Sequence, residues 1–246
     1  MRFCQNYMIV KIKDPSEFDS FDEINLFSVR IKSLLSAYKT EYDFASFYKQ
    51  IDDDDNVTAI ISKLDGNVTV SRKNSDNDEL AQFFGATGYS TVLTDTDLKL
   101  GGEFDEGVIM VSDKKAEYRL PFVFIDEYPK LMDLYNFQDY SSINFESWYV
   151  DVCHRIRHGC AKAYTVNVNG LIASSAIFSS IYNGSAVLSS VQTAPEFRRM
   201  GYGRALVSHM ISDVTGSVFL MRDADKNERF YMKSGFKNCG KWRMYK

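Results

Sequence analysis

The sequence predicts a mixed α/β protein with a mostly antiparallel sheet flanked by helices, and three observations support this fold class. Apolar residues recur every three or four positions in some segments and every second position in others. Tight-turn dipeptides at Asp65-Gly66, Asn169-Gly170 and Asn183-Gly184 separate segments of the second kind. The order helix, three-strand meander, helix, strand occurs twice, over 22–94 and 145–221. Two α/β domains built in a similar order are therefore expected, with internal duplication as a hypothesis.

The first half starts with an amphipathic helix over residues 22–38, whose apolar residues fall on one face. After this helix, apolar residues recur at every second position. The elements that follow are predicted as three strands, a short helix and a strand, at 44–50, 57–63, 67–73, 78–86 and 89–94. An acidic run from Asp52 to Asp55 separates the first two strands. It lacks the twelve-residue ligand spacing of a calcium loop, which favours a solvated hairpin turn.

The best domain boundary lies near residues 113–126, after an irregular stretch that contains a strand at 107–112. The elements predicted beyond it are two helices, three strands, a helix, a strand, a short helix and a closing pair of strands, at 128–137, 145–159, 161–169, 171–182, 186–193, 201–214, 217–221, 225–234 and 236–246. We expect an N-terminal α/β domain at 1–120 and a second domain at 121–246.

The composition excludes some classes of partner. Thirty-three acidic against 29 basic residues give a net charge of -4, so no overall positive field is present to bind nucleic acid or an anionic membrane. The apolar run from Tyr7 to Val10 is too short for a signal peptide or a membrane span. The cysteines are too sparse for a disulfide framework and form no CxxC pair: Cys4, Cys153, Cys160 and Cys239. We expect a cytoplasmic, soluble protein with free thiols, in which any anion site is local.

One stretch, APEFRRMGYGRALV at 194–207, combines glycines and arginines at the start of a predicted helix. The first turn of a helix has backbone N–H groups without partners and the positive end of the helix dipole, so an anion binds there readily. Gly201 and Gly203 leave room for a pyrophosphate to approach these amides. The arginines of the stretch add charge and paired donors. A plain turn with a solvated basic patch is the alternative.

Two other nucleotide motifs are excluded. The chain contains no GxxxxGKS or GxxxxGKT sequence, and the GxG at 201–203 lacks the third glycine and the later acidic ribose ligand of a dinucleotide-binding unit. What remains is an arginine, two residues, a glycine, one residue and a glycine after the last strand of a meander.

This loop resembles the signature of the GNAT acyl-CoA N-acyltransferase superfamily, in which Gln or Arg is followed by two residues, Gly, one residue and Gly or Ala. Arg198, Gly201 and Gly203 match it. Downstream, RFYMKSGF at 229–236 resembles the family's last helix, in which a tyrosine precedes a Gly-Phe pair by four residues. The resemblance covers roughly residues 128–246. It implies a sheet whose strands 186–193 and 217–221 splay apart, with the thioester arm of acetyl-CoA in the gap.

The resemblance also implies roles for individual residues. Backbone groups of the strand would hold the pantetheine arm, and the loop at 198–204 would hold the pyrophosphate. The complete set of cofactor-binding candidates is Val191, Gln192, Thr193, Arg198, Arg199, Met200, Gly201, Tyr202, Gly203, Arg204 and Asn227. Asn227 departs from the family pattern, whose asparagine lies seven residues before the tyrosine, where this chain has Ala224.

The corresponding junction of the first half is SRKNSDNDEL, which contains acids and no glycine. Carboxylates at that position repel a phosphate. If the first half is a degenerate copy of the second, it has lost CoA binding and serves as a lid, a substrate platform or packing support.

Transfer of an acyl group from CoA to an amine needs a neutral amine, a stabilised oxyanion and a proton for the departing thiolate. Tyr231 is the candidate proton donor, because a tyrosine with an ordinary pKa near ~10 keeps its proton at neutral pH. Packing of the last helix onto the sheet is the alternative role for its ring. The backbone N–H of Val191 is the candidate oxyanion donor.

The candidate general base is His154, on a polar stripe of the helix at 145–158 where Asp151 could orient it. A solvated helix face explains the same stripe. Cys153, His154, His158 and Cys160 also suggest a zinc site. The cysteines do not share the histidine face, however, and no second ligand pair follows, so no metal is expected.

The leading functional hypothesis is an acetyl-CoA-dependent N-acetyltransferase acting on a primary amine of a small molecule or a peptide. A non-catalytic CoA-binding or regulatory module is one alternative, and a structural protein in which the loop is only a turn is another. The residues of the chain do not specify the acceptor or the oligomeric state.

Overall fold

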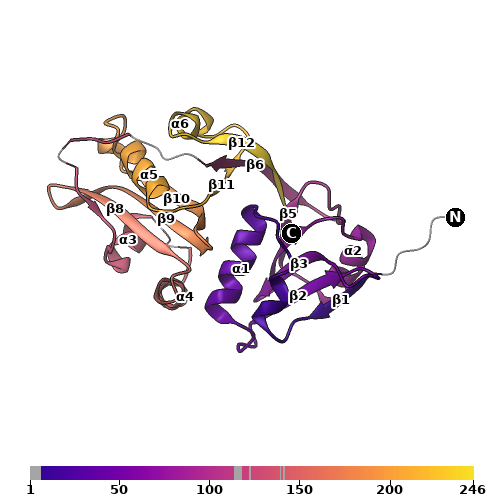
Figure 1. Ribbon diagram of the computed structural model, residues 1–246. Coiled ribbons are helices and arrows are strands. Elements are labelled where there is room, and N and C mark those ends of the chain that lie inside the picture. The colour runs from indigo at the N-terminus through magenta and orange to yellow at the C-terminus, as the bar shows by residue number, and fades with distance from the viewer. Residues whose placement is uncertain (1–6, 114–117, 122, 139, 141) are drawn as a thin grey trace. The chain divides into compact units, whose positions relative to one another are not determined.

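The computed structural model describes residues 7–113, 118–121, 123–138, 140 and 142–246. The chain forms two compact units. One ends at Ile109 and is completed by Gly240–Lys246, and the other runs from Met110 to Cys239. In Figure 1 each unit consists of a sheet with helices packed against it.

The first unit is a mostly antiparallel sheet. Its strands are β1 (Met8–Lys11), β2 (Ala45–Ile51), β3 (Val57–Leu64), β4 (Asn67–Arg72), β5 (Thr91–Asp95), β6 (Phe104–Ser112) and β12 (Lys237–Tyr245), in the order β1-β2-β3-β4-β5-β12-β6. The ladders from β1 to β4 and the ladder of β5 with β12 are antiparallel, whereas β4 and β5 run parallel. β6 begins in this unit and ends in the other.

Two helices cover opposite faces of this sheet. α2 (Asn77–Thr87) packs Leu80 and Phe84 into a core cluster that includes Val70 of β4. α1 (Leu26–Tyr38) contacts β3 and β4, and its N-cap residue Asn25 accepts a hydrogen bond from the Ser71 hydroxyl at 3.1 Å. Neighbouring strand residues point to opposite faces of the sheet. Val70 therefore packs against α2, whereas Ser71 forms a hydrogen bond with the N-cap residue of α1.

The second unit repeats this plan. Its strands are β7 (Ile125–Asp126), β8 (Lys162–Val168), β9 (Leu171–Tyr182), β10 (Ser185–Thr193) and β11 (Val218–Asp223), in the order β11-β10-β9-β8-β7. Its helices are α3 (Leu131–Phe137), α4 (Phe145–Arg157), α5 (Tyr202–Ser212) and α6 (Glu228–Lys233). Leu134 of α3 and Trp148 of α4 pack against Ala163. The next residue of β8, Tyr164, turns to the opposite face and contacts His209 of α5, with ring centroids 6.1 Å apart.

The mixed α/β fold class and the repeated order of elements are confirmed. The helices and strands predicted before residue 236 are present, with ends shifted by a few residues. The sequence patterns did not predict four short elements, because four or fewer residues are too few to show a period. These are β1, η1 (Pro15–Phe18), β7 and η2 (Pro195–Phe197).

The prediction of a closing pair of strands is wrong, since residues 237–245 form the single strand β12. Gly240 lies within this strand and makes no turn. β12 pairs with β5 from Trp242 opposite Asp95 to Tyr245 opposite Val92. Because of this pairing, residues 240–246 pack with the first unit. The two units divide between residues 109 and 110, whereas the sequence suggested a boundary near residue 120.

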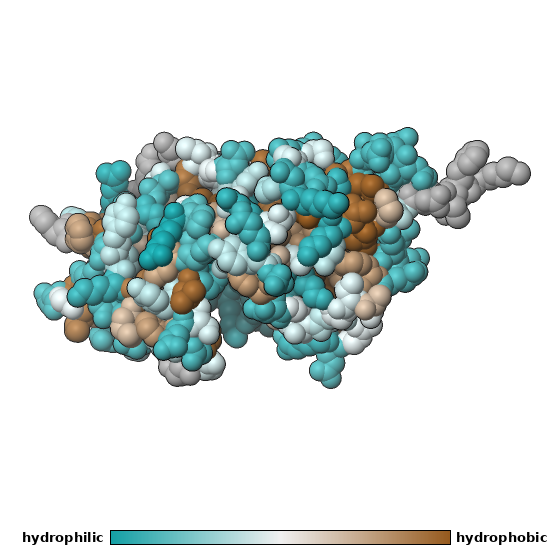
Figure 2. Space-filling view, turned by 90° about the horizontal axis from the view of Figure 1, so that it is seen from below, coloured by the Kyte–Doolittle hydropathy of each residue, from teal (hydrophilic) through white to brown (hydrophobic). Residues whose placement is uncertain are grey.

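The surface carries no broad hydrophobic area on the face seen in Figure 2, where hydrophilic residues predominate and hydrophobic ones form small separate areas. Isolated exposed apolar residues of this kind are normal for a globular protein. Among the helices of the described residues, none is long and apolar enough to cross a membrane.

Candidate active site

The second unit contains a gap between two parallel strands. β10 and β11 pair only at Ala186–Val218, Val187–Phe219 and Leu188–Leu220. Both strands continue beyond these pairs, β10 to Thr193 and β11 to Asp223. The parallel ladder therefore ends before the strands do, in keeping with the splaying of strands 186–193 and 217–221 that the family resemblance implied.

A β-bulge lies on β10 where the gap opens. The register with β9 shifts between Ser189 and Gln192, and Ser190 has a positive φ of 52°, which non-glycine residues rarely adopt. Val191 is thus outside the paired register with β9 and beyond the pairing with β11. Its backbone groups therefore have no partner in either of these two ladders.

The N-terminus of α5 lies next along the chain. Its N-cap residue is Gly201, with φ of 90° in the left-handed region, and no side chain caps the first amides. The Nε of Arg204 is buried without a hydrogen-bond partner in the described part of the chain. An uncapped helix start beside an unsatisfied guanidinium donor fits a pyrophosphate group. These residues therefore suit the phosphates of an acyl-CoA.

Two residues of the preceding segment lie over this helix start. A Cβ on Gly201 would be 2.6 Å from the Tyr118 hydroxyl oxygen, and the Arg204 guanidinium lies 4.1 Å from the centroid of the Tyr118 ring. The same added Cβ would lie 3.4 Å from a methyl carbon of Leu120. Tyr118 further lines a pocket of about 330 Å³ beside α5. Sequence patterns give no sign of this contact, because Tyr118 lies in an irregular segment.

Gly203 has a packing role that the sequence did not reveal. It is buried, and a Cβ at this position would be 2.8 Å from the Thr193 hydroxyl oxygen. That hydroxyl is in turn 3.0 Å from the Ser174 hydroxyl of β9. The glycine therefore lets α5 approach the end of β10 closely, so that the helix start lies next to the gap.

The remaining residues of the loop are exposed or partly exposed. Arg198 donates from Nε to the Thr193 carbonyl at 3.2 Å, which ties the loop to the end of β10. Arg199 has a positive φ of 67° and Met200 is 56% exposed. Tyr202 contacts the ring of Phe197, with centroids 6.0 Å apart. The Gln192 side chain donates to the Phe137 carbonyl at 2.8 Å.

Tyr231 lies on α6 and is 9% exposed. Its ring contacts those of Phe230 and Phe236, with centroid distances of 5.1 and 5.8 Å. Burial raises the pKa of Tyr231 above the ordinary value of 10.0, so the hydroxyl stays protonated at neutral pH. Asn227 is the N-cap of α6, and its carbonyl accepts from the Tyr231 N–H at 3.1 Å. The asparagine thus lies one helical turn from the tyrosine, with an exposed side chain.

His154 lies on α4, which covers the face of the sheet opposite α5. Its ring is 4.3 Å from that of His158. Asp151, the residue expected to orient His154, forms an ion pair with Arg155. Within the described residues, no three His, Cys, Asp or Glu side chains are placed to hold a metal ion. Cys153, Cys160 and Cys239 are not part of a disulfide, and Cys4 lies outside the described residues.

The first unit has a similar junction with different chemistry. β4 and β5 pair in parallel from Asn67–Thr91 to Thr69–Leu93, a ladder as short as that of β10 with β11. The N-cap residue of α2, Asp76, accepts from the Asp78 and Glu79 amides at 2.9 and 3.0 Å. The carboxylate therefore occupies the amides that an anion would need.

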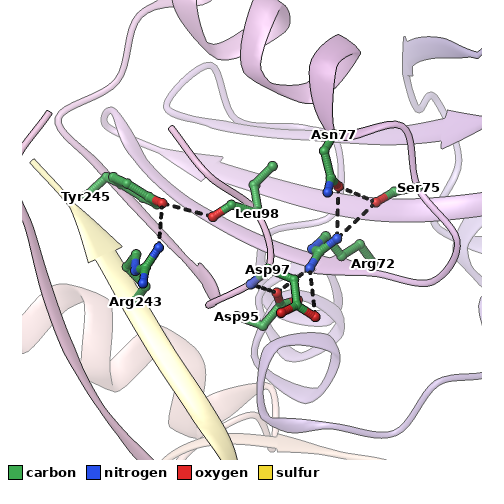
Figure 3. Close-up of polar contacts among 8 residues, drawn as sticks. All are labelled: Arg72, Ser75, Asn77, Asp95, Asp97, Leu98, Arg243 and Tyr245. Carbon is green, nitrogen blue, oxygen red and sulfur yellow. Dashed lines mark hydrogen bonds and ion pairs between the residues drawn. The ribbon is translucent and has the colours of Figure 1, made fainter. Parts of the chain in front are cut away.

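Arg72 closes the space between β4 and β5. Figure 3 shows its guanidinium between the acidic groups near the end of β5 and the polar residues that start α2. It forms ion pairs with Asp95 and, at 3.8 Å, with Asp97. It also donates to Asn77 at 2.9 Å and to Ser75 at 3.5 Å. The sequence showed the acids of this junction but not the arginine that bridges the strands.

Comparisons with known proteins agree with this geometry. The family model described as "Acetyltransferase (GNAT) family" matches residues 123–236. This part of the chain carries the ends of β10 and β11, the α5 start and Tyr231, and it is similar to the acetyltransferases of that family. None of the curated protein sequences compared matches the chain.

Solved structures resemble the chain over its whole length. A Drosophila protein from a structural genomics consortium has a TM-score of 0.65 at 12% identity, covering 98% of this chain and 99% of that one. A GCN5-related N-acetyltransferase from Sphaerobacter thermophilus has a TM-score of 0.57 at 12% identity, covering 97% and 94%. A tandem GNAT protein from the clavulanic acid biosynthesis pathway has a TM-score of 0.55 at 8% identity, covering 98% of each chain. At such identities these likenesses establish the fold.

Proposed function

We propose that the second unit is an acetyl-CoA-dependent N-acetyltransferase that acetylates a primary amine of a small molecule or a peptide. The observation that carries the proposal is the gap between β10 and β11 beside the uncapped start of α5, where Arg204 has an unsatisfied buried donor. This arrangement offers an anion seat and a channel for a thioester arm in direct succession. The family match of residues 123–236 supports the same reading.

The reaction assigns a task to each candidate residue. Bound acetyl-CoA supplies a thioester carbonyl that an amine nitrogen attacks, so that a C–N bond forms and the C–S bond breaks. The Val191 N–H, next to the bulge, donates to the oxygen on which negative charge develops. The Tyr231 hydroxyl gives its proton to the departing sulfur. His154 remains our candidate for the group that removes the proton of the amine.

We propose that the first unit is a GNAT-like copy that does not bind CoA. Arg72 bridges the strands where the thioester arm would lie, and Asp76 caps the amides that would bind phosphate. The tandem GNAT relative supports a two-domain arrangement of this kind. The proposal also includes a reducing, cytoplasmic location, in keeping with the three cysteines that are not part of a disulfide.

Isothermal titration of the full chain with acetyl-CoA tests whether the chain binds the cofactor and how many molecules it binds. We expect saturable binding of a single acetyl-CoA per chain, with Tyr118 displaced from Gly201. Arg204→Met removes a charged donor, which weakens binding by about tenfold or more. The matched control is Arg157→Met, at the exposed end of α4, which leaves the affinity unchanged.

The outcomes separate the candidate functions. No binding of acetyl-CoA by the wild-type chain contradicts the proposal and leaves the loop as a structural turn. Binding of two molecules per chain contradicts the assignment of the first unit. Tight binding without acetyl transfer to any member of a broad panel of primary amines favours a non-catalytic CoA-binding module.

A further inference from the structure

The bulge on β10 is held from outside the strand by two residues that follow α3. The Gln138 side-chain amide donates to the Ser190 carbonyl at 2.6 Å, and it also donates to the Ser175 hydroxyl of β9. The Tyr140 hydroxyl donates to the Ser190 hydroxyl at 2.5 Å. The backbone carbonyl and the side-chain hydroxyl of Ser190 are thus both bound by side chains distant in sequence.

These contacts stabilise a backbone conformation that is unfavourable by itself. A non-glycine residue rarely adopts the left-handed region, and it persists there when its surroundings fix it. Gln138 also connects the bulge to β9 across the place where their register shifts. Burial raises the pKa of Tyr140 above its ordinary value of 10.0, so its hydroxyl remains a donor at neutral pH.

We propose that Gln138 and Tyr140 are positioning residues, which fix the β10 bulge and thereby aim the Val191 N–H at the thioester carbonyl. The inference rests on the proposed function and adds residues to it that the family motifs do not contain. Tyr140 also contacts Trp148 of α4, with ring centroids 5.5 Å apart. The segment after α3 therefore links the α4 side of the sheet to the group that stabilises the oxyanion.

The expected consequence is a loss of carbonyl polarisation with little loss of affinity. Gln138→Met keeps the length of the side chain and removes both donated hydrogen bonds, and Tyr140→Phe removes only the hydroxyl. The hydrogen bonds and ring contacts described for these two residues go to β9, β10, α3 and α4, so we expect the start of α5 to stay intact. A displaced oxyanion donor lowers kcat by about tenfold to a hundredfold, because alignment within about 1 Å decides its effect.

Isotope-edited infrared spectroscopy of bound acetyl-CoA, labelled with ¹³C at the thioester carbonyl, tests the inference without an acceptor. In the wild-type protein the carbonyl stretch shifts to lower frequency than in buffer. In both variants most of this shift disappears, while the dissociation constant stays within about threefold, because the phosphate contacts are unchanged. Thermal unfolding of each variant establishes that it is folded.

Tyr135→Phe is the matched control. The Tyr135 hydroxyl bonds the Ile143 carbonyl in the same aromatic cluster and makes no contact with Ser190, so its removal leaves the carbonyl shift unchanged. A wild-type shift retained in both Gln138→Met and Tyr140→Phe overturns the inference alone. Absence of acetyl-CoA binding by the wild-type protein overturns the proposed function as well.

Discussion

At the scale of single residues, the two glycines of the α5 start differ in what they do. Gly201 has a positive φ, whereas Gly203 has helical geometry and serves close packing against Thr193. The sequence motif contains both without separating these roles. Each role can be tested by adding one methyl group.

We predict that Gly203→Ala lowers the free energy of unfolding by about 1–3 kcal/mol, because the new Cβ meets the Thr193 hydroxyl at 2.8 Å and forces α5 away from β10. Gly85→Ala is the control, since Gly85 lies in α2 with no atom within 4 Å of a new Cβ. That change raises stability by up to about 1 kcal/mol through helix propensity. Urea denaturation measures both. Equal effects of the two substitutions would contradict the packing role.

Tyr231 is expected to act through its hydroxyl and not through its ring. Tyr231→Phe keeps the contacts with Phe230 and Phe236, so acetyl-CoA affinity and stability stay close to wild type. The rate kcat falls by about tenfold to a hundredfold, because the departing thiolate loses its proton donor.

The pH dependence of kcat gives a second test of Tyr231. Because burial raises its pKa above 10.0, the protonated form predominates at all lower pH values. Ionisation of Tyr231 therefore produces an alkaline decline of activity whose midpoint lies above pH 10.0. A decline of kcat centred below that value in the wild type, and absent in Tyr231→Phe, would contradict the raised pKa of Tyr231.

At the scale of elements, an ionic network attaches β7 to its neighbours. Glu127, just after β7, lies 2.8 Å from the Lys162 ammonium of β8 and 2.9 Å from His209 Nε2 of α5. Lys162 also bonds Asp213, just after α5, at 2.7 Å. A strand of two residues has little ladder of its own, so these charges fix its position on the unit.

Glu127→Gln should therefore destabilise the second unit in a pH-dependent way. Hydrogen bonds from Lys162 and then His209 lower the pKa of Glu127 below its ordinary value of 4.5. The stabilisation is fully present above pH 4.5 and is lost as the pH falls through the lowered pKa of the folded state. We expect wild type to exceed the variant by about 1 kcal/mol at neutral pH and by less in acid. Thermal unfolding at several pH values measures the difference, and a gap that widens in acid would disprove the network's role.

At the scale of the whole molecule, the chain returns to its first unit after completing the second. Tyr245 is 1% exposed, and its hydroxyl donates to the Leu98 carbonyl at 2.9 Å. Figure 3 shows this contact beside Arg243, which donates to the same hydroxyl at 3.2 Å. Tyr245 of the last strand is thus part of the hydrophobic core of the first unit.

Deletion of Gly240–Lys246 is predicted to destabilise the first unit by several kcal/mol, since the loss of one large buried aromatic side chain costs about 3–5 kcal/mol. Hydrogen exchange should show reduced protection in β4 and β5, with protection in β8 and β9 largely kept. The control is Lys246→Ala, whose side chain is 53% exposed. Full protection of β5 after the deletion would contradict the structural role of β12.

The sequence by itself determined the features that depend on neighbouring residues. Apolar periods, turn dipeptides and the two motifs around Gly201 and Tyr231 gave the fold class, nearly all the elements and the family. Such patterns are local, because helix and strand periodicity and turn geometry are set by residues a few positions apart.

Only the tertiary structure decided which distant residues meet. It placed β12 beside β5, set Arg72 across the gap of the first unit, laid Tyr118 on Gly201, and brought Gln138 and Tyr140 to the bulge at Ser190. These contacts join residues separated by tens of positions or more. No local period encodes them, because they follow from packing and hydrogen bonding once the sheet has formed.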